Sequence, residues 1–295
     1  MATVTPRAQT HIRWRALALA ATLLLAVTIQ SATAQGLPRA TPEEVGMSSE
    51  RLERLSDALQ AYVDNGEVAG TATIVLRHGK VVYQEAFGHL DMESRSPMTT
   101  DGIFRIASQT KAPISVGVMM LQEEGKLLIT DRVGKYLPEF AQTTVGVPNE
   151  GGGYHVVPAN RPILIRDLLT HTAGISYGAG AAGQAWQEAG ITGWYFADRN
   201  EPVGATVARL AALPMTAQPG TSWVYGYNTD ILGALIEKVS GQPLDDFMRE
   251  HILDPLGMDD THFYLPTADR ERLATVYSAT SNGLERAPNP GHMVG

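Results

Sequence analysis

A serine and a lysine three residues apart, Ser108 and Lys111, are the first residues of this chain that could do chemistry together. Residues three apart on a helix share a face, and their side chains nearly touch. A serine at a helix N-terminus feels the positive end of the helix dipole, which favours its alkoxide. We expect partial desolvation to lower the pKa of the lysine amine, so that it could take the serine proton. On these residues alone, a capping serine beside a solvated lysine is an equally good interpretation.

The surrounding pattern indicates where this pair sits in the fold. Ser108 is expected to open a helix that runs to about Glu124. Two β-rich runs precede it, residues 71–77 and 80–88, and His78-Gly79 between them is typical of a hairpin turn. The serine therefore follows a transition from strands to helix.

The rest of the chain indicates which elements must position this pair. Ser48-Ser49 can cap a first helix that ends near Asp64, with Leu52, Leu55, Leu59 and Tyr62 on one stripe. Residues 230–240 predict another helix, in which Ile231, Leu232, Leu235, Ile236 and Val239 face inward. The segments 146–162 and 174–193 are expected to be long loops that line a site or move. Helix, hairpin and helical block together predict an α+β fold, an antiparallel sheet flanked by helices, with a helical subdomain at about residues 112–250.

Composition limits the classes of function. The chain has 295 residues, a formal net charge of −8 and no basic run, which argues against nucleic acid and anionic membranes as partners. It contains no cysteine, which excludes disulfides and thiolate chemistry. Arg7, Arg13 and Arg15 precede an apolar run that is shorter than the roughly 20 residues of a spanning helix. Residues 1–34 are therefore predicted to be an export signal cleaved after Ala34, leaving a periplasmic or secreted domain over residues 35–295.

Four stretches occur in one order along the chain: FRIASQTKAPISVGVMMLQEEGKLLITDRVGKYLPEF, LLTHTAGI, WVYGYNTDILGALIEKVSG and ILDPLGM. Together they resemble the serine β-lactamase-like family, which includes class C β-lactamases, DD-peptidases and family VIII carboxylesterases. The resemblance covers about residues 40–285. It implies that Ser108 is the acylated nucleophile, that Lys111 is its base and that a tyrosine completes the site.

That tyrosine is identified as Tyr225, since Trp223, Tyr225 and Gly226 occupy the places of the family's second motif. A phenol near the serine and lysine could pass the proton to the leaving group. Tyr227 is the alternative, and a packed core aromatic with a satisfied hydroxyl is the simpler interpretation of Tyr225. β-Lactamases and DD-peptidases carry asparagine where this chain has Tyr227, and that amide holds the substrate's amide side chain. Asn228 lies one residue further on, out of register with the family's asparagine. The tyrosine at position 227 therefore favours esters over β-lactams as substrates.

Other candidates have simpler explanations. His171 looks like a general base, but the resemblance makes it a structural turn residue. Asp230 is interpreted as a helix N-terminal residue, and Gly151-Gly152-Gly153 as a flexible loop. The histidines lack the spacing of zinc ligands, so neither a metal nor an organic cofactor is expected.

These observations predict an exported serine hydrolase that acylates Ser108 and hydrolyses small carboxylic esters, with the Ser108 N–H and a strand N–H as oxyanion donors. A β-lactamase or D-amino-acid peptidase is the second hypothesis. A penicillin-binding or sensor module that acylates without turnover is the third.

The relatives close the site with a third motif, Lys-Thr-Gly, His-x-Gly or Trp-x-Gly, on a later strand. No such motif follows Tyr225; His292 and Gly295 have one residue too many between them. We therefore expect the chain to be incomplete at its C-terminus, with its hairpin lacking strand partners. On this expectation, residues 35–295 alone express poorly and hydrolyse esters weakly.

Overall fold

The computed structural model describes residues 36–197, 199 and 201–288. The predicted export segment, residues 1–34, lies outside these residues, and so do His292 and Gly295. Within the described part of the chain, no helix has the length and apolar character needed to cross a membrane.

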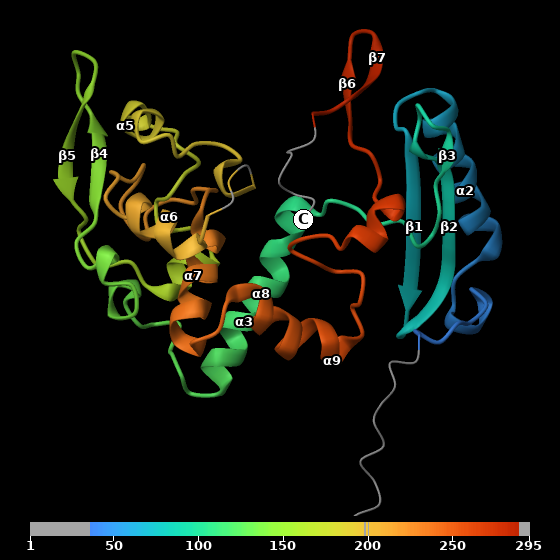
Figure 1. Ribbon diagram of the computed structural model, residues 1–295, viewed down its shortest axis with the longest axis horizontal. Coiled ribbons are helices and arrows are strands. Elements are labelled where there is room, and N and C mark those ends of the chain that lie inside the picture. The colour runs from blue at the N-terminus through green and yellow to red at the C-terminus, as the bar shows by residue number, and fades with distance from the viewer. Residues whose placement is uncertain (1–35, 198, 200, 289–295) are drawn as a thin grey trace, which may run out of the picture.

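The fold is α+β, as predicted, with a sheet region on one side and a helical region on the other (Figure 1). The α-helices of the described residues are α2 (Ser49–Asp64), α3 (Lys111–Glu123), α4 (Ile165–Leu169), α5 (Gly183–Glu188), α6 (Val203–Leu210), α7 (Asn228–Ser240), α8 (Leu244–Met248) and α9 (Asp254–Leu256). The strands are β1 (Gly70–Arg77), β2 (Lys80–Asp91), β3 (Ser96–Pro97), β4 (Thr144–Pro148), β5 (Tyr154–Pro158), β6 (Tyr277–Thr280) and β7 (Gly283–Arg286). Helix α3 runs between the two regions (Figure 1).

The sheet region is an antiparallel sheet in the order β1-β2-β3. The predicted hairpin is confirmed: His78 and Gly79 both have positive φ, 51° and 71°, as a tight turn between twisted strands requires. Helix α2 packs on one face of the sheet, where the Ser56 hydroxyl lies 3.0 Å from the Tyr83 hydroxyl. Among the described residues, no strand pairs with the second edge of β1.

Helix α2 begins and ends where the sequence predicts. The Ser48 side chain caps it by accepting a hydrogen bond from the Arg51 N–H. The apolar stripe is only partly covered: α2 buries no residue, and Tyr62 is 48% exposed. The reason is that a single sheet face covers only part of the stripe.

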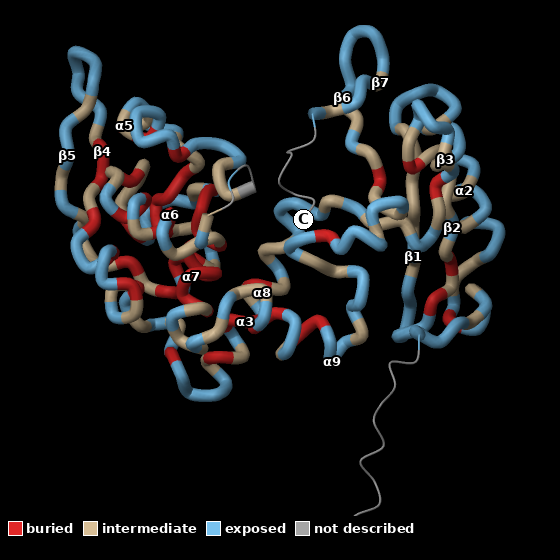
Figure 2. The backbone as a smooth tube through the Cα atoms, viewed as in Figure 1, coloured by how far each residue is buried: buried red, intermediate tan, exposed pale blue. Residues whose placement is uncertain are grey.

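The helical region contains the main core, seen as the concentration of buried residues in Figure 2. Helix α7 lies at its centre and packs against α3, α4, α6 and α8. Four of the residues predicted to face inward are completely buried, namely Ile231, Leu232, Leu235 and Ile236. Gly241, with φ 77°, ends the helix in the left-handed conformation.

The segment 146–162 is not the loop that the sequence predicts, because β4 and β5 form a hairpin there. Val145 pairs with Val157 across the hairpin and buries its side chain in the helical core. The three glycines lie in the turn between the strands, where Gly152 and Gly153 have positive φ. Packing against the core therefore makes strands of residues whose glycine content suggested a loop.

Candidate active site

Ser108 lies in a short 3₁₀ turn, Ala107–Thr110, that leads into α3. The α-helix proper starts at Lys111, three residues later than predicted. The preceding Ala107 has φ 44°, a left-handed conformation that costs a non-glycine residue about 1–2 kcal/mol. Backbone strain is therefore located directly beside an exposed serine.

Lys111 and Ser108 are in contact, as their spacing predicts. The Lys111 Nζ donates a hydrogen bond of 3.1 Å to the Ser108 Oγ. Lys111 is half-buried, while Ser108 is exposed. The serine thus faces solvent with a lysine amine fixed at its hydroxyl.

Tyr225 reaches the same place from the loop that precedes α7. The Lys111 Nζ lies 4.8 Å from the centre of its ring. Hydrogen bonding with Ser108, and then with Lys111, holds the pKa of the Tyr225 phenol below its ordinary value. Gly226 lets this loop pack tightly, since a Cβ there would lie 2.3 Å from the Ile175 carbonyl oxygen. The structure therefore brings Ser108, Lys111 and Tyr225 together.

Tyr177 is a fourth member of the cluster that sequence reasoning missed. Its ring meets that of Tyr225 edge-on at 5.8 Å, and its phenol is a hydrogen-bonding partner of Lys111. Burial raises the pKa of the Tyr177 phenol. Tyr177 lies in the segment 174–193, which the sequence predicts to be a long loop that lines a site or moves. Helix α5 forms within this segment, at Gly183–Glu188, so the loop that carries Tyr177 is shorter than predicted. The length pointed to the loop, but nothing in the sequence pattern selected this residue.

The pKa of Lys111 differs from the prediction. Burial lowers the pKa of the amine, as expected, but hydrogen bonding to Tyr225 and then Tyr177 outweighs burial and leaves the pKa above its ordinary value. Two phenols around one amine therefore favour the ammonium form. The direction of this shift is opposite to the one expected from desolvation alone, because the sequence did not show how many hydroxyl partners the amine has.

Tyr227, the alternative to Tyr225, is a core residue. It is 1% exposed and its hydroxyl donates a 3.0 Å hydrogen bond to the Gly193 carbonyl. Its ring packs edge-on against Tyr177 at 4.7 Å. Asn228 is completely buried and its amide donates to the Ile175 carbonyl. Neither side chain presents an amide to the space above Ser108.

His171 packs against Tyr225 in the candidate site. Its ring lies 4.7 Å from that of Tyr225, and its Nδ1 is 3.0 Å from the Asn228 amide nitrogen. Since the amide N–H donates, Nδ1 is the acceptor. Burial, and then the charge of Lys111, lower the pKa of the imidazole. His171 also has φ 56°. These features fit a structural turn residue.

Asp230 occupies the first turn of α7, as predicted. It is half-buried, and burial raises the pKa of its carboxyl to about 6. The charge of Lys111 opposes this rise, which places the carboxyl within electrostatic reach of the amine. A helix N-terminal acid is thus also part of the electrostatic surroundings of the site.

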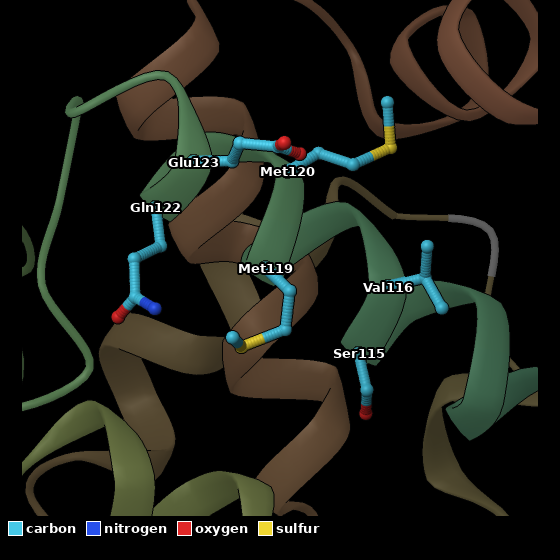
Figure 3. A pocket seen from close by; sticks show the side chains of 6 residues that line it. All are labelled: Ser115, Val116, Met119, Met120, Gln122 and Glu123. Carbon is cyan, nitrogen blue, oxygen red and sulfur yellow. The ribbon is translucent and has the colours of Figure 1, made fainter.

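A hollow of about 510 Å³ lies along α3, and none of Ser108, Lys111, Tyr177 and Tyr225 lines it (Figure 3). Its lining comes entirely from α3: Ser115, Val116, Met119, Met120, Gln122 and Glu123. It holds no nucleophile paired with a base, because the Ser115 hydroxyl donates to the Lys111 carbonyl. Within the described part of the chain, no three His, Asp or Glu side chains gather as a metal site. The Ser108 cluster is therefore the candidate active site.

Comparison with known proteins agrees with this choice. The sequence matches the beta-lactamase family over residues 55–295. It is 32% identical to esterase EstB of Burkholderia gladioli, over 76% of this chain and 54% of EstB. It is 30% identical to the lovastatin esterase of Penicillium rubens, over 79% of this chain and 59% of that enzyme. The chain thus spans little more than half the length of these relatives.

A solved structure shares the fold. EstCE1, described as a hydrolase with promiscuous acyltransferase activity, matches with a TM-score of 0.69 and 31% identity. The match covers 81% of this chain and 59% of EstCE1. The described arrangement of helices and antiparallel strands is therefore one that a solved protein adopts.

Proposed function

The chain belongs to the beta-lactamase family, and we propose that it is a serine hydrolase that cleaves small carboxylic esters through an acyl-enzyme on Ser108. The observation that carries the proposal is the convergence of Lys111 and Tyr225 on the Ser108 hydroxyl. A nucleophile beside groups that can move its proton is the arrangement that acyl transfer needs. The relatives named as esterases support the substrate class.

The directions of the two pKa shifts support Tyr225 as the group that takes the proton. Hydrogen bonding to the two phenols raises the pKa of Lys111, which favours the cationic amine. The lowered pKa of Tyr225 makes its phenolate accessible, and the adjacent ammonium stabilises that charge. Tyr225 is therefore the base toward Ser108, and Lys111 is the group that tunes it.

The reaction then balances in two steps. The Ser108 Oγ bonds to the ester carbonyl carbon, its proton passes to Tyr225, and the carbon–oxygen bond to the alcohol breaks as Tyr225 returns the proton to the departing oxygen. Water next attacks the acyl carbonyl while Tyr225 takes its proton; the bond from the acyl carbon to the Ser108 Oγ breaks, Tyr225 returns the proton to that oxygen, and the acid is released. This scheme uses neither a metal nor an organic cofactor. The Ser108 N–H is the expected oxyanion donor.

The buried position of Tyr227 supports esters over β-lactams. Its hydroxyl is engaged with Gly193 inside the core, and the Asn228 amide is held in the core as well. No amide from these positions is free to hold the side chain of a penicillin or cephalosporin. An ester has no such requirement.

A fluorophosphonate label and a pair of substrates test the proposal. We expect one label per chain, at Ser108, and a kcat/KM for p-nitrophenyl acetate well above that for nitrocefin. Ser108→Ala is expected to remove both labelling and turnover. Full labelling of Ser108→Ala would contradict the nucleophile, and a nitrocefin value equal to the ester value would favour a β-lactamase. Labelling without turnover would favour a sensor.

The proposal also includes export. The arginines and apolar run of residues 1–34 support it, together with the small residues Ala32 and Ala34. Mass spectrometry of the protein from the periplasm or medium is expected to show a mature N-terminus at Gln35. Recovery of the uncleaved chain from the cytoplasm would contradict it.

A further inference from the structure

Trp223 places an exposed indole directly against the candidate active site. Its side chain is 68% exposed, although its ring stacks on the Tyr225 ring with centres 5.6 Å apart and planes 23° apart. A single exposed aromatic residue is ordinary on a protein surface. This one is distinctive because it stacks on the ring of Tyr225, a partner of Ser108.

The backbone that carries Trp223 is firmly held. The Val224 N–H donates to the His171 carbonyl at 2.8 Å, and the Gly220 N–H donates to the Thr172 carbonyl at 2.7 Å. The His171 ring also meets the indole edge-on at 6.2 Å. A rigid aromatic side chain on an anchored loop provides contact area at a low cost in conformational entropy.

We propose that the Trp223 indole binds the alcohol portion of the ester and makes the enzyme selective for planar, apolar alcohols. This inference rests on the proposed function, in which Tyr225 returns a proton to the departing oxygen. That oxygen must lie at the Tyr225 hydroxyl, so the group attached to it extends beside Tyr225, where the exposed indole stands. The acyl carbon remains bonded to Ser108.

Two acetate esters isolate this contact, ethyl acetate and 2-naphthylmethyl acetate. Both form the same acetyl-enzyme, and their alcohols are of similar acidity, so they differ only in what the alcohol touches. In Trp223→Ala we expect kcat/KM for the naphthylmethyl ester to fall about tenfold, the size of an aromatic contact of about 1.4 kcal/mol. The kcat/KM for ethyl acetate is expected to change less than twofold in Trp223→Ala. For the naphthylmethyl ester, the kcat/KM of Trp223→Phe is expected to lie between those of the parent protein and Trp223→Ala.

Trp194 provides a matched control, because its indole is 67% exposed and no ring contact joins it to Tyr225 among the described residues. Trp194→Ala is expected to leave the ratio of the two esters unchanged. An equal loss on both esters in Trp223→Ala would overturn the inference, since it would mean that the indole merely positions Tyr225. A ratio that shifts equally in Trp194→Ala would also overturn it.

A binding measurement separates this inference from the proposed function. In a Ser108→Ala background, calorimetry with 2-naphthylmethanol is expected to show weaker binding when Trp223 is also replaced by alanine. Equal affinity in the two proteins would overturn the contact even if the esterase activity is real. Loss of affinity would support the contact even if turnover of both esters is weak.

Discussion

The helical and sheet regions differ in how completely each buries its apolar residues. Helix α7 buries eight of its residues, whereas α2 buries none. The sheet region buries fewer side chains: among its described residues these include Val81 and Tyr83 of β2, and a cluster of Leu90, Met98 and Ala274 with Ala72 and Ala86 packed against it. Strand β1 leaves Ile74 49% exposed and Leu76 44% exposed. The helical region therefore has one large core, while the sheet region buries only a few side chains.

This difference explains why the candidate site depends on the helical region. Lys111 begins α3, and the inner face of α3 belongs to the helical core through Ile114, Val118 and Leu121. Tyr177 and Tyr225 lie on loops of the same region. The outer face of α3 carries the half-exposed Val116 and Met119 (Figure 3). The helical region thus positions Lys111, Tyr177 and Tyr225, while the segment before Ser108 is hydrogen-bonded through Ile103 to Arg272 and Ala274.

The largest expected effect compares one leucine from each region. Leu235 is completely buried in α7, so Leu235→Ala is expected to lower the free energy of unfolding by about 3 kcal/mol. Leu76→Ala removes a half-exposed side chain and is expected to cost less than about 1 kcal/mol. Urea unfolding followed by circular dichroism measures both. Equal losses would show that the two regions are equally well packed.

Ion pairs offer a second comparison, of intermediate size. In the helical region Asp167 is 4% exposed and accepts two hydrogen bonds from the Arg161 guanidinium, at 2.7 and 3.1 Å. Asp167→Ala is expected to cost about 2 kcal/mol, because charged hydrogen bonds are lost. The exposed pair Glu50–Arg54 on α2 is its counterpart, and Glu50→Ala is expected to cost about 0.5 kcal/mol or less. A large loss in Glu50→Ala would contradict this ranking.

The smallest effect depends on pH and has opposite signs in the two regions. Burial raises the pKa of Asp230 from 3.8 to about 6, so this carboxyl destabilises the fold as pH rises through 6. Asp230→Asn is expected to gain about 1–2 kcal/mol at pH 8 and nothing near pH 4. Hydrogen bonding to Ser94, Thr275 and Arg286 lowers the pKa of Asp91, whose contribution is present above its ordinary pKa and lost as pH falls.

Thermal unfolding of both asparagine variants between pH 4 and pH 8 checks these signs. Asp91→Asn is expected to lose stability at pH 8 and to approach the parent protein in acid. A gain for Asp91→Asn at pH 8, or a loss for Asp230→Asn, would mean that the surroundings of the two carboxyls are misassigned.

Much of the fold could be predicted from local sequence pattern. The hairpin turn at His78-Gly79, the cap at Ser48 and the end of α7 at Gly241 are all local, because backbone conformation at these positions depends on neighbours in the sequence. The β4–β5 hairpin was missed for the opposite reason. Its valines form strands because Val145 packs into a core made by distant residues.

The sequence by itself determined that Ser108 and Lys111 touch, since a helical turn brings residues three apart together wherever it occurs. Resemblance to the family's second motif predicted that Tyr225 belongs to the same site, and the structure places Tyr225 beside Ser108 and Lys111. Only the tertiary structure decided that Tyr177 joins the cluster, that Tyr227 turns into the core, and that hydrogen bonding to two phenols raises the pKa of Lys111. The physical reason is that the pKa of a side chain, and how far it is buried, depend on every group packed around it. Those groups come from loops far apart in the sequence.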